Sequence, residues 1–325
     1  MKQQEQRLDG FRLRVLYGLL RLVHRLGLGP TADSVASKSI ASRKANKAPG
    51  WMTLPLPAEV RMIGGSISGR SAPIAIKQYL PPRLNPACPR VLFMHGGGWI
   101  TGGVDTLDHL CANVSLQAQC LVVSVDYRLA PETPFPGALE DCYDALEWLA
   151  NDPSLGAAPA CGIAVMGESA GGNLAAALCV LNAREGKVAV CHQTLIYPCV
   201  DATLASPSID NGQPGLDRKN IERLLDLYRG NAALTDPLLS PMHADNHAAL
   251  PPALIITADI DPARDDGARY ADKLKAAGVP VKYANYLGMP HGFIFMPAIC
   301  SAALDGIRKI STEIAACATA ERATR

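Results

Sequence analysis

The residues with the clearest chemical meaning form the run Gly167-Glu168-Ser169-Ala170-Gly171, in which a serine lies two residues from a glycine on either side. An apolar run precedes it and an Ala- and Leu-rich run follows, which predicts a sharp turn from a strand into a helix. Such a turn exposes the serine hydroxyl and requires neighbours without bulk two residues away. The start of the helix also favours negative charge near the serine. An ordinary Gly-Ser turn would carry the same letters, but this context favours a nucleophile at Ser169.

A serine nucleophile requires a base, and the sequence offers seven histidines. Of these, only His291 follows a late predicted strand. A carboxylate must then orient the imidazole, and both Asp259 and Asp261 follow the strand predicted just before it. Asp261 precedes a proline and a predicted helix, which suits a helix N-cap and would leave Asp259 to serve His291. Because a carboxylate has two oxygens, one residue can fill both roles.

A second glycine-rich run, His95-Gly96-Gly97-Gly98-Trp99, also follows a predicted strand. Three glycines let the backbone approach a bound molecule closely. Their N–H groups, with that of Ala170, can bind the oxyanion of a tetrahedral intermediate. A phosphate-binding loop is the alternative, but neither a G-K-[ST] sequence nor a G-x-G-x-x-G arrangement is present. We expect His95 to be structural, hydrogen bonding to the loop backbone and fixing its shape.

These residues need a scaffold that brings the ends of several strands together. From about residue 57 the chain alternates short apolar runs with helical segments, which predicts an α/β fold with a mostly parallel sheet and helices on both faces. Ligands then bind at the carboxyl ends of the strands. The predicted strands are Ile74–Leu80, Arg90–Met94, Cys120–Val125, Gly162–Met166, Gln193–Tyr197, Ala253–Ala258 and Val281–Leu287. The predicted helices are Pro136–Leu149, Ala170–Leu181, Lys219–Tyr228 and Asp265–Ala277.

Two segments fall outside this alternation. The first 50 residues hold ten Lys and Arg but three Asp and Glu. Within them, Phe11–Leu26 has the apolar spacing of an amphipathic helix. We expect this helix to cover part of the protein's own core, with a position on a membrane surface as the alternative. Residues 31–50 are predicted to be a connector, and residues 200–235 an insertion over the site.

Composition argues against several other classes of protein. Of 325 residues, 48% are apolar and 19% charged, which suits a globular fold with a buried core. The net charge of +1 shows no overall basic excess, so we expect no nucleic-acid partner. No apolar run approaches the ~20 residues of a membrane span. The ten cysteines include no C-x-x-C pair, so we expect neither a zinc site nor a redox site, and small buried thiols suit a reducing, cytoplasmic location.

Together these motifs resemble the hormone-sensitive-lipase-like family of esterases, also called bacterial family IV. The resemblance covers roughly residues 70–310. Besides the motifs above, it rests on DYRLAPE at 126–132 with Phe135-Pro136, on Asp236-Pro237 before Ser240-Pro241, on Asp261-Pro262 with RDDG at 264–267, and on His291-Gly292-Phe293. One departure is visible, because the residue before the nucleophile is usually Asp or Thr in this family and is Glu168 here.

The resemblance implies an α/β-hydrolase fold with a helical cap, and it assigns roles by position. The family's triad falls on Ser169, Asp261 and His291, and its oxyanion donors fall on the N–H groups of Gly97, Gly98 and Ala170. Its cap corresponds to N-terminal helices plus an insertion. We therefore expect a cap segment and connector at residues 1–50, and a catalytic domain at residues 51–325 with a cap insertion at about 200–235.

The resemblance further implies hydrolysis of short- to medium-chain acyl esters without a metal or cofactor. The expected function is a serine carboxylesterase that forms an acyl-enzyme on Ser169, with a small-molecule ester as its partner. Two alternatives stay open. The same machinery could cleave an amide or a lactone, since leaving-group protonation and pocket shape decide between these. The chain could also be a non-catalytic binding protein, as some plant hormone receptors resembling this family are. Homodimer formation is open as well.

Overall fold

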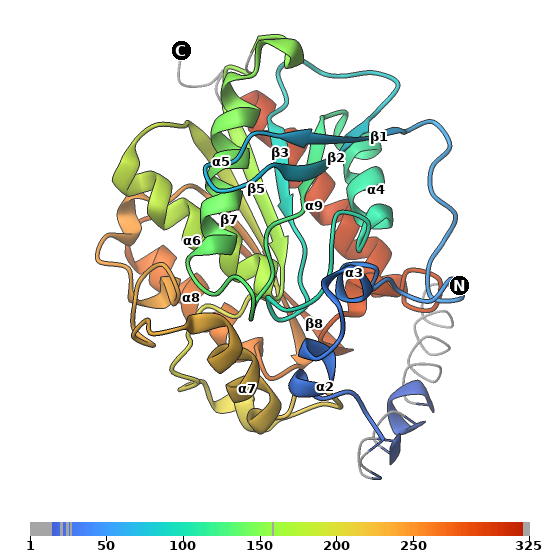
Figure 1. The fold of residues 1–325 in the computed structure, drawn as a ribbon. Helices are drawn as coiled ribbons and strands as arrows, with labels where there is room; N and C mark the ends of the chain where they lie inside the picture. Colours follow the sequence, from blue (N-terminus) through green and yellow to red (C-terminus); the bar gives the residue numbers. More distant parts are fainter. Residues whose placement is uncertain (1–14, 20–21, 24–25, 27, 158, 321–325) are drawn as a thin grey trace.

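The computed structural model describes residues 15–19, 22–23, 26, 28–157 and 159–320. Within these residues the chain builds one eight-stranded sheet in the order β1-β2-β4-β3-β5-β6-β7-β8 (Figure 1). β2 pairs antiparallel with β1 and β4, and every pair from β4 to β8 is parallel. The prediction of an α/β fold with a mostly parallel sheet is confirmed. The strands are β1 Arg61–Ile67, β2 Ile74–Leu80, β3 Arg90–Met94, β4 Val122–Val125, β5 Ile163–Glu168, β6 Val190–Ile196, β7 Ala253–Ile260 and β8 Val281–Pro290.

Helices cover both faces of the sheet (Figure 1). Helices α4 and α9 pack on one face, and α5, α6 and α8 pack on the other. Side chains of β3 alternate between the two layers, with Val91 and Phe93 facing α4 and α9, and Leu92 and Met94 facing the opposite layer. This burial on both sides explains why the strands appear as continuous apolar runs. The helices of these layers are α4 Asp108–Ala118, α5 Gly137–Asn151, α6 Ala170–Glu185, α8 Arg264–Ala276 and α9 Ser301–Ala320.

Three of these elements, β1, α4 and α9, were not predicted. Strand β1 is a mostly exposed edge strand with two central glycines, so its sequence lacks an apolar alternation. Helix α4 is buried over most of its length and therefore lacks a clear polar face. Helix α9 does carry a signal, since Ala303, Ile307, Ile310 and Ile314 recur at helical spacing and are all buried.

The segment at residues 31–50 is not a plain connector. It forms two short helices, α2 Ala32–Ala36 and α3 Ile40–Lys44. The side chains of Thr31 and Ser39 accept N–H hydrogen bonds at the two helix starts, which is the usual role of such residues. Helices this short are not stable alone and depend on contacts with the rest of the protein. The local sequence does not reveal those contacts.

A buried arginine attaches this segment to the catalytic domain. Arg43 of α3 is 1% exposed, and its Nη1 donates to the carbonyls of Ile100 and Ala130 at 2.8 and 2.7 Å. The guanidinium also forms an ion pair with Glu132. Since Ile100 lies in the loop after β3, α3 is fixed directly behind the glycine-rich run that begins at His95.

The amphipathic helix expected at Phe11–Leu26 lies partly outside the described residues. In the described part, Leu16 packs against the core. Val15, Leu19, Leu22 and Leu26 are instead 48–63% exposed. The apolar stripe therefore does not cover the protein's core there, contrary to the expectation. Across the portion of the chain that the structure describes, no helix is long and apolar enough to span a bilayer.

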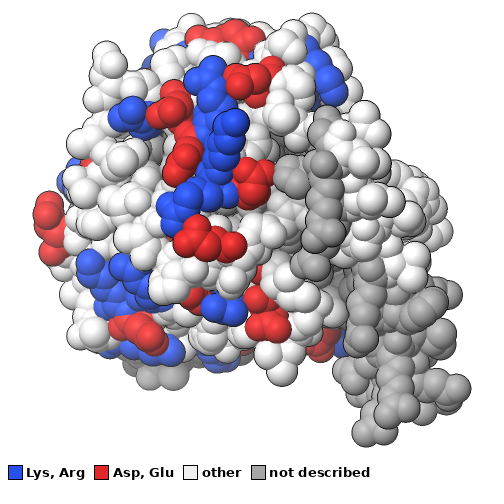
Figure 2. All heavy atoms as spheres, turned by 90° about the horizontal axis from the view of Figure 1, so that it is seen from below, with Lys and Arg blue, Asp and Glu red and all other residues white. Residues whose placement is uncertain are grey.

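Helix α7 Arg218–Arg229 lies in the region predicted as an insertion, and it packs beside α2 (Figure 1). The N–H of Ala32 donates to Asn220 Oδ1 at 2.7 Å, and Arg223 pairs with Asp33 at 2.7 Å. Figure 2 shows Lys and Arg interleaved with Asp and Glu on the lower face of the molecule. Helices α2 and α7, which lie far apart in the sequence, therefore pack against each other at one end of the sheet.

Candidate active site

Ser169 stands at the turn between β5 and α6, where both strand and helix point toward it. Its backbone has φ 55° and ψ −121°, a conformation that residues other than glycine rarely adopt. Both flanking residues have to be glycine, because there is no room for a Cβ atom at either position. A Cβ on Gly167 would lie 2.1 Å from the Gly171 carbonyl oxygen, and one on Gly171 would lie 2.1 Å from that of Met94. The sharp turn expected from the sequence is therefore present.

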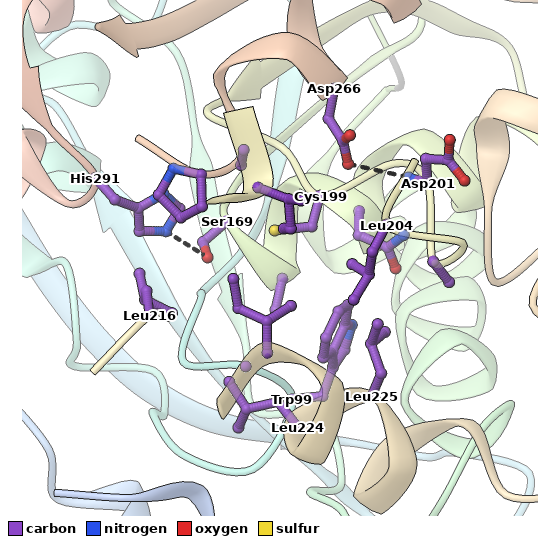
Figure 3. Close-up of a pocket in the computed structure, with 18 of the residues that line it drawn as sticks. Trp99, Ser169, Cys199, Asp201, Leu204, Leu216, Leu224, Leu225, Asp266 and His291 are labelled. Carbon is purple, nitrogen blue, oxygen red and sulfur yellow. Dashed lines mark hydrogen bonds between the residues drawn. The ribbon is translucent and has the colours of Figure 1, made fainter. Parts of the chain in front are cut away.

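The structure brings Ser169, His291 and Asp261 into one hydrogen-bonded chain. His291 follows β8 directly, and its Nε2 lies 2.7 Å from Ser169 Oγ (Figure 3). Its Nδ1 lies 2.9 Å from Asp261 Oδ2. Asp261 is fully buried, and its other oxygen, Oδ1, accepts the N–H of Ala263 at 2.7 Å. The carboxylate thus serves both the imidazole and the turn before α8.

Asp259, the competing candidate, does not approach the imidazole. Its carboxylate is 37% exposed, accepts the N–H of Gly288 at 3.2 Å and lies 3.9 Å from the Arg264 guanidinium. Helix α8 begins at Arg264, so Asp261 is not its N-cap residue, although it does accept a hydrogen bond from the preceding turn.

The surroundings of His291 act on its charge in opposite directions. Burial lowers the pKa of the imidazole, whereas the charge of Asp261 and the hydrogen bond that His291 donates to it raise the pKa, and Glu168 acts in the same direction. The net pKa of His291 is raised above its ordinary value. The neutral form can accept a proton from Ser169, and the protonated form is stabilised by the carboxylate behind it.

Three backbone N–H groups near Ser169 are available to an anion. Those of Gly97, Gly98 and Ala170 donate to no acceptor within the described residues. Gly97 and Gly98 adopt φ +112° and +59°. A Cβ on Gly97 would lie 2.1 Å from the Thr101 carbonyl oxygen, so this loop conformation requires glycine.

The loop is supported from behind by His95 and Tyr127. His95 Nδ1 lies 2.8 Å from the Gly96 carbonyl oxygen, and the ring stacks on Tyr127 at 4.2 Å between centroids. The Tyr127 hydroxyl donates to the His95 carbonyl at 2.7 Å. Complete burial lowers the pKa of His95 to about 4, so the ring is neutral at physiological pH. The expected structural role of His95 is confirmed.

Two cavities adjoin Ser169. The inner cavity, about 60 Å³, is lined mainly by apolar side chains from α7 and from the segment after β6 (Figure 3). The outer cavity, about 250 Å³, is bounded by α2, α7 and the glycine-rich loop. Residues shared by both cavities are Gly98, Ser169, Leu216, Leu224 and His291. A bound molecule at Ser169 could therefore extend in two directions.

Several residues of the site were not found from the sequence. The Tyr197 ring lies 4.5 Å from the His291 ring, between centroids, and Cys199 lines the inner cavity. Both follow β6, so the rule that ligands meet strand ends could have identified them. Gln213 accepts the N–H of His291 at 3.1 Å, and no local signal marks it. Among the described residues, no cluster of three or more His, Cys, Asp or Glu could hold a metal ion.

The chain is similar to known esterases in sequence and in fold. Residues 91–295 match the profile of a family described as alpha/beta hydrolase fold. Carboxylesterase NlhH of Mycobacterium tuberculosis is 41% identical over 240 residues, covering 71% of this chain and 75% of NlhH. Esterase LipI of the same organism is 38% identical over 261 residues, covering 78% and 82%. The structure of a hyperthermophilic esterase from Pyrobaculum calidifontis superposes with a TM-score of 0.80 at 33% identity, covering 93% of this chain and 97% of that one.

Proposed function

The chain belongs to the hormone-sensitive-lipase-like esterases of the α/β-hydrolase family and is a carboxylic-ester hydrolase, and from this premise we propose that it cleaves short-chain acyl esters with Ser169, His291 and Asp261 as its triad. The observation that carries the proposal is the continuous hydrogen-bonded chain from Asp261 through His291 to Ser169. It ends at the junction of the two cavities, where an ester carbonyl can meet the serine.

The reaction follows from the positions of these groups. Ser169 Oγ attacks the ester carbonyl carbon while His291 Nε2 takes the hydroxyl proton. The N–H groups of Gly97, Gly98 and Ala170 bind the resulting oxyanion. His291 then returns the proton to the departing alcohol, which leaves an acyl group on Ser169. A water molecule, deprotonated by the same imidazole, releases the acid and restores the serine. Asp261 holds the imidazole in the required tautomer and stabilises its protonated form.

The test compares the wild-type protein with Ser169→Ala in hydrolysis of p-nitrophenyl butyrate and in labelling by a fluorophosphonate. We expect the variant to lose about 10⁴-fold or more in kcat, to resist labelling and to keep its circular dichroism spectrum. Labelled wild-type peptide should map to Ser169. Equal turnover by the folded variant would refute the assignment, and an unlabelled, inactive wild type would favour the non-catalytic binding function.

We further propose that the inner cavity accepts the acyl chain and limits its length. This cavity, about 60 Å³, is smaller than the outer cavity, about 250 Å³, and its lining is mainly apolar, which suits a short acyl chain. The expected optimum lies between acetyl and hexanoyl. The measurement is kcat/KM over p-nitrophenyl esters of increasing acyl length, and faster cleavage of palmitoyl than of butyryl esters would contradict the proposal.

We propose that residues 1–50 and 200–235 form a cap over the site, with residues 51–325 as the catalytic domain. Support comes from Ala32 and Val35 of α2 and from Leu224 of α7, which line the outer cavity together. Deletion of residues 1–50 should therefore change substrate preference. Unchanged kcat/KM across the ester series, in a truncated protein that stays folded, would argue against a cap.

The partner and location of the protein are proposals as well. A homodimer could form through β8, one of the two edge strands of the sheet among the described residues. Tyr283 and Leu287 on this strand are 37% and 78% exposed. Leu287→Lys should then shift a dimer to a monomer in size-exclusion chromatography with light scattering.

We also propose a cytoplasmic location, supported by ten cysteines that are all free thiols. Cell fractionation tests it.

A further inference from the structure

A buried glutamate adjoins the nucleophile and contacts the glycine-rich loop. Glu168 is the last residue of β5 and is 1% exposed. Its Oε1 accepts the N–H of Gly96 at 2.5 Å. A Cβ on Gly96 would lie 2.0 Å from the same oxygen, so only glycine lets the carboxylate come this close. The contact fixes the residue directly before Gly97 and Gly98, whose N–H groups face the oxyanion in the proposed reaction.

Ionisable groups surround Glu168 from several segments. They are His291 after β8, Tyr197 and Cys199 after β6, and Tyr127 after β4. Burial raises the pKa of both tyrosines and of Cys199 well above the ordinary values, so these three groups stay neutral. Burial also raises the pKa of Glu168 to about 7, although His291 and the Gly96 N–H oppose this. Glu168 and His291 also line the same outer cavity beside Ser169, which places the carboxylate near the imidazole.

We propose that Glu168 is a positioning residue that holds the oxyanion loop through Gly96 and supports the positive charge that His291 acquires during the reaction. The inference rests on the proposed function, because it assigns Glu168 a part in the same reaction. The two contributions use different properties of the side chain. Reach to Gly96 requires the full length of glutamate, whereas support of His291 requires the negative charge.

Two substitutions separate these properties. Glu168→Gln keeps the length and an oxygen acceptor for Gly96 but removes the charge. Glu168→Asp keeps the charge but shortens the side chain by one carbon–carbon bond, about 1.5 Å, so that the Gly96 N–H loses its partner. Glu59→Gln, at an exposed position before β1, is the matched control. Ser169→Ala reports separately on the proposed function.

The assay is kcat and KM for p-nitrophenyl butyrate from pH 5 to 9, with NMR titration of the His291 imidazole in wild type and Glu168→Gln. Loss of a nearby negative charge lowers the pKa of His291, so Glu168→Gln should retain more of its maximal activity in acid than wild type does. Its kcat at pH 8 should fall by up to about tenfold, the equivalent of one pKa unit. Glu168→Asp should lose about 10- to 100-fold in kcat through misplaced oxyanion donors, with KM unchanged and the wild-type acid limb.

The outcomes distinguish this inference from the proposed function. If the wild type turns over and Ser169→Ala does not, but both Glu168 variants match the wild type in kcat and pH profile, the positioning role is wrong. If Ser169→Ala is as active as wild type, the proposed function fails. The NMR titration needs no turnover, so an unchanged pKa of His291 in Glu168→Gln refutes the charge role in every case. A Glu168→Asp protein that does not fold leaves Glu168→Gln to decide.

Discussion

Replacing Asp261 by asparagine should disable His291 through its tautomer, and the structure dictates which way the amide will face. Oδ1 of Asp261 accepts the N–H of Ala263 at 2.7 Å, while Oδ2 lies 2.9 Å from His291 Nδ1. In the variant, the amide oxygen keeps the bond to Ala263, which places the NH₂ group against Nδ1. Nδ1 then becomes an acceptor, its proton moves to Nε2, and Nε2 can no longer take the proton of Ser169.

The flipped amide does not rescue the enzyme at a useful level. It would place the NH₂ group against the Ala263 N–H, and a buried N–H without a partner costs about 1–3 kcal/mol. The wrong tautomer therefore dominates by roughly 5- to 150-fold. Adding the lost stabilisation of the imidazolium, we expect kcat to fall by about 10⁴-fold, which corresponds to about 5.5 kcal/mol in the activation free energy.

Asp259→Asn is the matched control, because Asp259 follows the same strand and is partly exposed. Its contact with the Gly288 N–H can be kept by an amide oxygen, so kcat should change by less than about threefold. The assay is kcat and KM for p-nitrophenyl acetate at pH 8, with thermal unfolding of each variant. A folded Asp261→Asn within tenfold of wild type, or a larger loss in Asp259→Asn, would refute the reasoning.

Three further predictions follow from the described contacts. The pKa of His291 is raised and its neutral form is the proposed base, so kcat/KM should decline in acid from a pH above the ordinary imidazole value. A pH-rate profile that is flat from pH 5 to 8 would exclude His291 as the base. Arg43→Met should lower the free energy of unfolding by about 2–4 kcal/mol in urea titration, because two buried carbonyls and Glu132 lose their donor, and an unchanged midpoint and slope would contradict this. EDTA should leave ester hydrolysis unchanged, and inhibition that added zinc reverses would show that a metal takes part.

Most residues of the proposed site could be selected from the sequence, because they lie where strands end. Ser169 and His291 each directly follow a strand, and both could be identified by that position and residue type. The local pattern left Asp259 and Asp261 both open, because both residues follow the predicted strand, and the family resemblance favoured Asp261. That strand was predicted to end at Ala258, but β7 continues to Ile260. Asp259 is therefore a strand residue, and Asp261 is the first residue beyond the strand.

Other features could not be predicted, because they depend on segments far apart in the chain. Glu168 meets Gly96 across 72 positions, and Gln213 meets His291 across 78. The two short helices at residues 31–50 depend on Arg43, whose partners lie in loops some 60 to 90 residues away. Local periodicity carries no information on such contacts, since each is decided by the packing of the completed sheet.

The backbone at Ser169 also affects how this protein can evolve. Its positive φ is a conformation that costs most residues about 1–3 kcal/mol, whereas glycine adopts it readily. Selection for heat resistance alone would therefore favour glycine at position 169, which removes the hydroxyl along with the strain. Laboratory evolution of a more stable catalyst from this chain has to measure turnover in every round, because the substitution that relieves the strain at position 169 also removes the proposed nucleophile.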